Sequence, residues 1–396
     1  MTLCAHADFA SRHGSKGTEE ACSRMPCNPA EFRNSLSSWY LKHCRKLPWR
    51  ENPSPYRIWV SEAMLQQTQV KTVIPYYQRF VLKFPDIACL AAADTEDVLK
   101  AWEGLGYYAR ARNLHRAARQ VCLNYGGCVP ESYAAFRSLP GVGDYIAAAV
   151  LSIAFHQPLC VVDGNVKRVL ARILMIDDPV NSASARERFQ SEAERLLDRK
   201  HPGCFNQAMM ELGALICRPG NPQCNECPVK NPCFSFQNDR TSDYPKREVR
   251  PKTPLYHMVA GVVLKDHEIL IARRPMEGLL GGLWEFPGGR VEADESPEVA
   301  CIRNIAKTVN LQVAVDCHVG RIKHAYTHFR ILMDVFVCRH CGGTVRLNGP
   351  EAFRWISLNE IENHAFPAGH HKFIPRLRTI LQSFLEPDMD RHNRLI

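Results

Sequence analysis

The first half of the chain carries apolar residues every three or four positions, separated by short polar breaks. The stretches with this spacing are residues 32–40, 56–66, 70–84, 144–155 and 166–174. That period places apolar side chains along one face of a helix. Amide and hydroxyl side chains interrupt the pattern at residues 66–69, and Pro75 leaves the start of the following helix open. We therefore expect an all-helical first half with short connections.

From residue 255 onward the apolar runs have the length of strands. We expect strands and helices over residues 256–263, 268–272, 297–309, 319–323, 329–337 and 371–384, of which the third and the last are helices. These elements predict an α/β domain over residues 255–388. Polar and charged residues with two prolines fill residues 238–254 and are typical of a linker. The expected helical domain then covers residues 29–237, after a flexible tail over residues 1–28.

Length, composition and charge restrict the class of protein. A chain of 396 residues with 45% apolar and 23% charged side chains has the composition of a globular protein of two or three domains. An excess of 50 lysines and arginines over 41 acids gives a net charge of +9, which favours a polyanionic partner. No run of about 18 apolar residues is present, which excludes a membrane-spanning helix. The 17 cysteines, without an export signal, indicate reduced thiols or a metal site.

Four cysteines lie together near the end of the helical half, separated by six, two and five residues. They are Cys217, Cys224, Cys227 and Cys233. Four thiolates in a short loop that also contains several prolines form a ligand set for a tetrahedral metal centre. The spacing alone does not separate zinc from an iron-sulfur cluster.

Two acids stand where their surroundings would change their pKa. Glu62 lies among apolar residues of the expected 56–66 helix, and burial against them would raise its pKa, as a general acid requires near neutral pH. Asp163 stands at the N-cap of the 166–174 helix, whose dipole would lower its pKa. The plainer alternatives are an exposed acid at a helix edge and an ordinary N-cap.

Three connections are candidates for contact with a nucleic acid. Gly141 and Gly143 can adopt positive φ and present the N–H groups of the following helix to a phosphate. The amide-rich break at residues 66–69 and the glycine- and tyrosine-rich run at residues 102–108 are suited to enter a base stack. An arginine-bearing helix follows the second run, and its guanidinium groups would hold phosphates. Ordinary connectors with a solvated basic face are the alternative.

Three runs together resemble the helix-hairpin-helix DNA glycosylases, and the first and the last of them resemble the adenine glycosylases of the MutY type. They are residues 59–70, 139–145 and 162–170. The resemblance implies removal of adenine mispaired with 8-oxoguanine or guanine. It makes Glu62 the general acid and Asp163 the stabilising carboxylate, positioned by Tyr145 and Asn165. It also implies contacts with DNA or with the flipped adenine by Arg50, Gln67, Thr68, Leu105, Tyr107, Gly141, Gly143 and Gln207.

The same resemblance bears on the chemistry and on the cysteines. Related enzymes that also cleave the strand carry a lysine nucleophile eighteen positions before the aspartate, and Tyr145 stands there in this chain. Because a phenol cannot form a Schiff base, we expect a monofunctional glycosylase. The four cysteines would hold a [4Fe-4S] cluster within a loop over residues 217–233.

The second domain resembles a degenerate Nudix domain. Gly288, Gly289, Glu295 and Arg303 are spaced as in a Nudix box. Lys307 and Thr308 replace the adjacent glutamates that would bind Mg²⁺, so pyrophosphate hydrolysis is not expected. The resemblance implies that this domain recognises 8-oxoguanine through a strand loop, which here contains Tyr326, Thr327 and His328.

The expected protein is therefore multidomain. An all-α helix-hairpin-helix glycosylase domain with a [4Fe-4S] loop is followed by an α/β Nudix-like domain. We expect it to act as a monomer on double-stranded DNA, at the nucleoid in a bacterial cytoplasm or in the nucleus of a eukaryote. Three alternatives stay open: an endonuclease III-like glycosylase and lyase for oxidised pyrimidines, a nucleotide pyrophosphatase, and an inert iron-sulfur DNA-binding protein.

Overall fold

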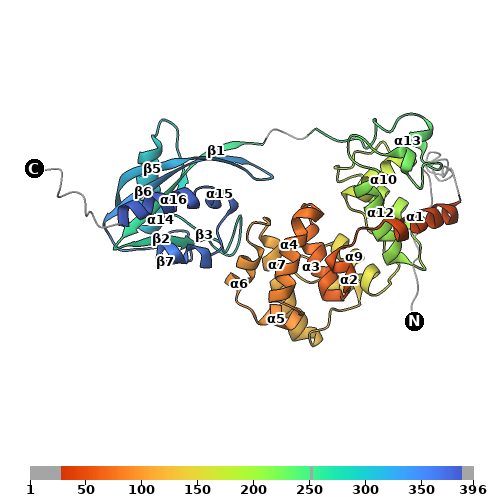
Figure 1. Cartoon of the computed structure of the whole chain (residues 1–396), viewed down its shortest axis with the longest axis horizontal. Coiled ribbons are helices and arrows are strands. Elements are labelled where there is room, and N and C mark those ends of the chain that lie inside the picture. Colours follow the sequence, from red (N-terminus) through yellow and green to blue (C-terminus); the bar gives the residue numbers. More distant parts are fainter. Residues whose placement is uncertain (1–27, 250–252, 386–396) are drawn as a thin grey trace, which may run out of the picture. The chain divides into compact units, whose positions relative to one another are not determined.

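The computed structural model describes residues 28–249 and 253–385 (Figure 1). The chain forms two units, one made of Met1–Arg45 with His156–Glu248 and the other of Lys46–Phe155 with Val249–Ile396. Residues 1–27 of the expected tail and residues 250–252 of the expected linker lie outside the described residues. Among the helices of the described part, none is both long and apolar enough to cross a membrane.

The first unit is helical. Its elements are α1 (Pro29–His43), α10 (Gly164–Leu174), α11 (Arg186–Leu196), α12 (Pro202–Leu215), the short 3-10 helix η2 (Cys224–Glu226) and α13 (Phe234–Gln237). The Asn28 side chain caps α1 by accepting a hydrogen bond from the N–H of Ala30, and Pro29 occupies the first helical position, where its missing N–H has no partner to lose. The apolar faces of these helices share one buried core that includes Phe32, Phe189 and Phe205.

Residues 46–155 of the second unit are also helical. Their elements are α2 (Pro48–Glu51), α3 (Pro55–Leu65), α4 (Val70–Lys83), α5 (Ile87–Ala92), α6 (Thr95–Trp102), α7 (Ala109–Tyr125), α8 (Tyr133–Arg137) and α9 (Asp144–Ala154). Pro75 lies inside α4, which begins at Val70. Trp59 packs edge-on against Phe136 at a centroid distance of 5.1 Å, so the start of α3 is anchored in the core.

The remainder of the second unit contains a mixed sheet, with seven strands in its described residues (Figure 1). The strands are β1 (Leu255–Lys265), β2 (Glu268–Arg273), β3 (Trp284–Glu285), β4 (Gly288–Arg290), β5 (Gln312–Ala325), β6 (Arg330–Gly342) and β7 (Ala352–Ile356). Their order is β3-β2-β1-β6-β5, with β4 also paired to β1 and β7 to β2. Strands β1 and β6 run parallel, and the other pairs are antiparallel. The strands expected over residues 256–263 and 268–272 are β1 and β2, which pair with each other, and β5 and β6 are longer than expected.

Two cores lie on the two faces of this sheet. Helix α14 (Pro297–Val309) packs through Cys301 and Ile305 on the face that contains Phe336. Helix α16 (Ile374–Leu385) packs through Leu377 on the face that contains Val335. Successive residues of β6 therefore point into opposite cores, as the pleat of a strand requires. The short helices η3 (Leu358–Asn363) and α15 (Ala368–His371) connect β7 to α16.

Gly288 lies where the backbone of β4 approaches β1 very closely. A Cβ atom added at Gly288 would stand 2.0 Å from the carbonyl oxygen of Val259. Because a paired strand cannot yield without losing ladder hydrogen bonds, Gly288→Ala should destabilise this domain by about 2–3 kcal/mol. Thermal unfolding should show a fall in Tm of several degrees. Gly164→Ala is the control, since a Cβ at this helical position meets open space, and its Tm should stay near that of the wild type.

Candidate functional site

Helix α3 carries one acid, Glu62, and the structure buries it. The Glu62 side chain is 5% exposed, in a helix whose neighbouring residues from Tyr56 to Met64 are almost all buried. The hydroxyl of Tyr145, in α9, donates a hydrogen bond to Glu62 Oε2 over 2.6 Å. The alternative of an exposed acid at the helix edge is therefore wrong. The expected upward shift of the Glu62 pKa stays a prediction.

Asp163 caps α10, as the sequence predicted. Its Oδ1 accepts from the N–H of Val166 at 2.7 Å, and its Oδ2 accepts from Asn165 Nδ2 at 2.9 Å. The expected low pKa is wrong, because burial disfavours the charged carboxylate and raises the pKa of Asp163 above its ordinary value despite these hydrogen bonds. The positive end of the helix is outweighed by desolvation.

Asn165 links Asp163 to the rest of the first unit. Its Oδ1 accepts from the guanidinium of Arg168 at 2.8 Å, and the same guanidinium donates to the carbonyl of Gly213 in α12. A Cβ on Gly213 would lie 2.6 Å from the Cβ of Asn165, so α10 and α12 approach closely at this point. The Asn165 amide therefore contacts Asp163 directly, and its role in positioning this carboxylate stays a prediction.

The glycine turn joins α8 to α9. Gly141 has a φ of +76°, and an added Cβ would stand 2.6 Å from the Asn113 Cβ. Gly143 has a φ of −88° and is the N-cap of α9, with open space where a Cβ would be. Positive φ is therefore required at Gly141 alone. The free space beside the first turn of α9 is compatible with the predicted phosphate contact.

The 66–69 loop and the 102–108 loop, which the sequence predicts to enter a base stack, each contain an exposed residue with left-handed backbone. Gln67 has a φ of 59° and Tyr107 a φ of 51°, and the Tyr107 side chain is 38% exposed. Thr68 is partly buried, and its hydroxyl accepts from the Arg110 guanidinium. Leu105 is 6% exposed, so in this structure its side chain is not accessible for the predicted contact with DNA.

The arginines of α7 bind backbone carbonyls. Arg110 donates to the carbonyl of Met64, Arg112 to that of Gly281, and Arg119 to carbonyls at the end of α5. These three guanidinium groups are thus engaged with backbone oxygens, and the prediction that the arginines of this helix hold phosphates stays a prediction. Their partners lie in segments far away along the chain, which the spacing of residues within a helix cannot reveal.

Tyr326, Thr327 and His328 form the tip of the β5–β6 hairpin. The N–H of Tyr326 donates to the carbonyl of Phe329, and the two rings lie 4.8 Å apart. Burial of the phenol raises the pKa of Tyr326 to about 12. Thr327 and His328 are exposed, and the Thr327 hydroxyl is hydrogen bonded to that of Tyr107. This hydrogen bond joins the 102–108 loop to the β5–β6 hairpin tip, two segments that the sequence predicts separately as contacts with DNA.

Gln207 and Arg50 were predicted to bind the adenine. Gln207, in α12, accepts a hydrogen bond from the hydroxyl of Tyr40 at 3.2 Å and donates to the carbonyl of Gly203. Arg50, in α2, is partly buried. Both roles stay predictions.

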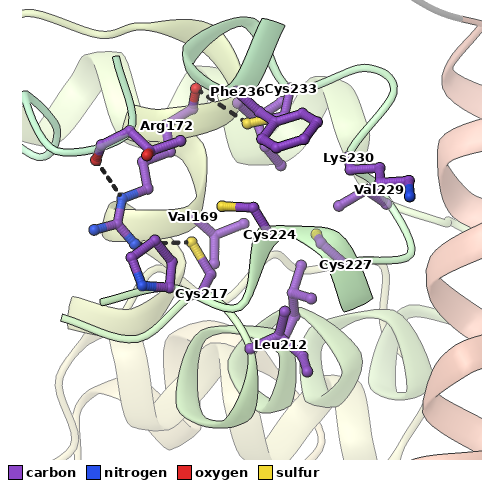
Figure 2. A pocket seen from close by; sticks show the side chains of 14 residues that line it. Val169, Arg172, Leu212, Cys217, Cys224, Cys227, Val229, Lys230, Cys233 and Phe236 are labelled. Carbon is purple, nitrogen blue, oxygen red and sulfur yellow. Dashed lines mark hydrogen bonds between the residues drawn. The ribbon is translucent and has the colours of Figure 1, made fainter. Parts of the chain in front are cut away.

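The four cysteines line one pocket (Figure 2). Apolar side chains from α10 and α12 complete its wall, and its empty space is about 380 Å³, part of it open to solvent. Burial raises the pKa of Cys227 to about 12, so its thiolate needs a nearby positive charge. Arg172 donates to Cys217 Sγ at 3.3 Å. Within the described ranges, no three His, Cys, Asp or Glu side chains are already arranged as a metal site.

Helix α14 contains the positions where the sequence lacks the adjacent glutamates of a Nudix box. Glu295 is held by Arg303 through two 2.7 Å hydrogen bonds, and this pairing lowers the pKa of Glu295 to about 2. Lys307 and Thr308 lie in the last turns of the helix, where the Thr308 hydroxyl donates to the carbonyl of Asn304. The carboxylate pair that would bind Mg²⁺ is therefore missing from α14.

Two family models match the chain in the order that the fold requires. The HhH-GPD superfamily base excision DNA repair protein matches residues 60–195, and the NUDIX domain matches residues 259–376. The first match contains Glu62, Tyr145 and Asp163. The predicted fold class, a helical glycosylase domain followed by an α/β Nudix-like domain, is confirmed.

The relatives decide the family. The adenine DNA glycosylase of Homo sapiens is 35% identical over 84% of this chain and 71% of that protein. That of Schizosaccharomyces pombe is 31% identical over 92% of this chain and 95% of that protein. The chain belongs to the adenine DNA glycosylase family. A solved thermostable thymine-DNA glycosylase is 28% identical, with a TM-score of 0.48, and covers 53% of this chain and 97% of that one.

Proposed function

We propose that this adenine DNA glycosylase hydrolyses the N-glycosidic bond of adenine mispaired with 8-oxoguanine or guanine in double-stranded DNA. The observation that carries the proposal is the buried Glu62 carboxyl, held by the hydroxyl of Tyr145 within the segment that matches the glycosylase family. A buried acid with one oxygen fixed by a neutral donor is suited to deliver a proton. The protein would act as a monomer in base excision repair.

Glu62 would protonate the leaving base. The Tyr145 hydroxyl donates to Oε2 and holds the Glu62 carboxyl in place. We propose that the protonated Glu62 carboxyl donates its proton to N7 of the flipped adenine, so that the base departs neutral. Arg50 and Gln207 would hold the adenine edge.

Asp163 would stabilise the sugar as the bond breaks. Its pKa is raised by burial in the protein without DNA, and a growing positive charge on the sugar would favour its ionised form. The hydrogen bonds from Val166 and Asn165 keep both carboxylate oxygens oriented while charge develops. Water would then attack the sugar carbon and pass a proton to the Glu62 carboxylate, which completes the hydrolysis and restores the acid.

Strand cleavage is not part of the proposed reaction. Tyr145 occupies the position of a lyase lysine, and its hydroxyl is engaged with Glu62. Without an amine no Schiff base forms there. An endonuclease III-like lyase is therefore the less favoured candidate.

We also propose that Cys217, Cys224, Cys227 and Cys233 hold a [4Fe-4S] cluster. The donor set fits, since four thiols face one pocket with an apolar wall and Arg172 beside it (Figure 2). When bound, the cluster would fix the loop that carries Lys230 and take no part in hydrolysis. Iron and acid-labile sulfide should each be found at four per chain in protein purified without air, and bound zinc with no sulfide would contradict the assignment.

The β5–β6 hairpin tip would read the oxidised guanine, with Gln67 and Thr68 contacting the same base. His328→Ala should lower the preference for adenine opposite 8-oxoguanine over adenine opposite guanine by roughly fivefold to tenfold, because one hydrogen-bonding group is lost. The measurement is the ratio of single-turnover rate constants on the two duplexes. His267→Asn removes another exposed imidazole from the β1–β2 turn and should leave the ratio unchanged. An unchanged ratio in His328→Ala would remove His328 from the recognition site.

One panel of duplexes tests the proposed function. It contains adenine opposite 8-oxoguanine or guanine, thymine glycol, and an abasic site, each incubated with and without later alkali. Cleavage at adenine that requires alkali is expected for a monofunctional adenine glycosylase. Cleavage of the abasic duplex without alkali, or release of thymine glycol, would support the lyase instead. Binding without any base release would indicate an inert DNA-binding protein.

A further inference from the structure

Arg110, at the second position of α7, joins three backbone segments with one guanidinium group. Its NH1 donates to the carbonyl oxygens of Ala63 at 3.0 Å, Met64 at 2.7 Å and Gln66 at 2.5 Å. Its NH2 donates to the carbonyl of Gly106 at 3.1 Å and to the hydroxyl of Thr68 at 3.3 Å. The guanidinium therefore holds the end of α3, the 66–69 loop and the 102–108 loop together.

The surroundings keep this cation in place without an acid. Arg110 forms no salt bridge with a carboxylate among the described residues, and the rings of Trp102 and Tyr107 lie 5.5 and 5.1 Å from its guanidinium carbon. Burial lowers the pKa of Arg110 to about 10, so the group stays charged at neutral pH. The carbonyls at the end of α3 carry the negative end of the helix dipole and stabilise that charge.

Each segment held by Arg110 leads to a residue that the proposed reaction uses. Ala63 and Met64 directly follow Glu62 in α3. Gln66 and Thr68 flank Gln67, and Gly106 precedes Tyr107. Both Gln67 and Tyr107 are exposed with left-handed φ, a conformation that costs an L-residue energy and persists only where the surrounding structure holds it.

We propose that Arg110 is a positioning residue that couples the loops reading the opposite base to the helix that carries the general acid. Its guanidinium fixes the positions of Gln67 and Tyr107 relative to α3. Contact of these residues with 8-oxoguanine would therefore place Glu62 correctly against the adenine. The inference rests on the proposed function. It assigns Arg110 a part in specificity, in place of the phosphate contact that the sequence predicted.

A purely structural arginine would behave differently. Loss of a capping arginine lowers stability and reduces the amount of active protein equally for every substrate. Loss of a coupling residue changes the ratio of the excision rates on the 8-oxoguanine and guanine duplexes. A displaced loop no longer stabilises the transition state more strongly when 8-oxoguanine is the opposite base. Arg119 offers a matched control, since it lies on the same helix and caps α5 through the carbonyls of Ala91 and Ala93.

The experiment uses the full chain in four forms: wild type, Arg110→Gln, Arg110→Lys and Arg119→Gln. Single-turnover rate constants are measured for adenine opposite 8-oxoguanine and opposite guanine, together with the Tm of each protein. In Arg110→Gln the ratio of the rate constant opposite 8-oxoguanine to that opposite guanine should fall by about tenfold. Small displacements of positioned groups lower rate constants by this factor or more. Arg110→Lys, which keeps the charge and reaches fewer oxygens, should fall between it and the wild type. Arg119→Gln should lower Tm and keep the wild-type ratio.

The outcomes separate this inference from the proposed function. A wild type that removes adenine, with an Arg110→Gln protein of unchanged ratio, overturns the role of Arg110 alone. If Arg110→Gln does not fold, the ratio in Arg110→Lys decides in the same way. A wild type that removes adenine from neither duplex overturns the proposed function and this inference together.

Discussion

Glu62→Gln should lose adenine excision by roughly a thousandfold while the protein still binds the mispaired duplex. Glutamine has the shape of glutamate and can still accept the Tyr145 hydrogen bond through its carbonyl oxygen, so α3 and α9 should keep their packing. The amide cannot release a proton to the adenine at neutral pH. Single-turnover excision and fluorescence anisotropy on the same duplex, with 8-oxoguanine opposite adenine, measure the two quantities.

Tyr145→Phe provides the matched control for this result. It removes the donor to Glu62 Oε2 and leaves the acid in place, so the rate should fall less, by about tenfold. The pH dependence of the rate should also move, because the carboxylate form loses a hydrogen bond and the pKa of Glu62 should rise. Full activity of the Glu62→Gln protein would refute the role of Glu62 as general acid.

Local signals predicted most of the elements of the fold. The expected helix over residues 297–309 is α14, since Ser296 caps it and Pro297 starts it. Pro75 left the start of the helix over residues 70–84 open, and α4 runs through it from Val70, because tertiary packing of Val73 and Tyr77 outweighs one missing hydrogen bond. The sequence predicts short strands for β5 and β6 because the exposed ends of these strands lack an apolar pattern. The strands are longer because their ends pair with each other.

The sequence singles out the two carboxylates because each has a local signal, and their catalytic roles stay predictions. Glu62 is a lone acid in an apolar stripe, and Asp163 precedes a helix. The direction of the Asp163 pKa was predicted wrongly, since the helix end is visible in the sequence and the depth of burial is not. The backbone contacts of Arg110 and the Tyr107–Thr327 contact were missed for a related reason. Their partners are backbone oxygens or residues from distant segments, and no spacing rule identifies those.

Asp163→Asn should reduce adenine excision by at least about a hundredfold, because a neutral amide cannot stabilise positive charge on the sugar. The variant should nevertheless fold. Asparagine is as good an N-cap as aspartate, and its Oδ1 can accept the hydrogen bond from Val166 N–H. The Asn165 amide would face a second N–H donor and lose one hydrogen bond, which costs about 1 kcal/mol. Single-turnover excision measures the loss of activity, and thermal unfolding measures the state of the fold.

The pH dependence of Tm separates the electrostatic role of Asp163 from a structural one. Folding raises the pKa of Asp163 above its ordinary value of 3.8, so the folded state binds this proton more tightly than the unfolded state does. The resulting stability is present below pH 3.8 and is lost as pH rises through the raised pKa, where the buried carboxylate must ionise. The amide of the Asp163→Asn variant does not titrate, so the Tm of the variant relative to the wild type should increase as pH rises over this window. A relative Tm that falls with rising pH would mean that the ionised Asp163 stabilises the fold, and its raised pKa would then be wrong.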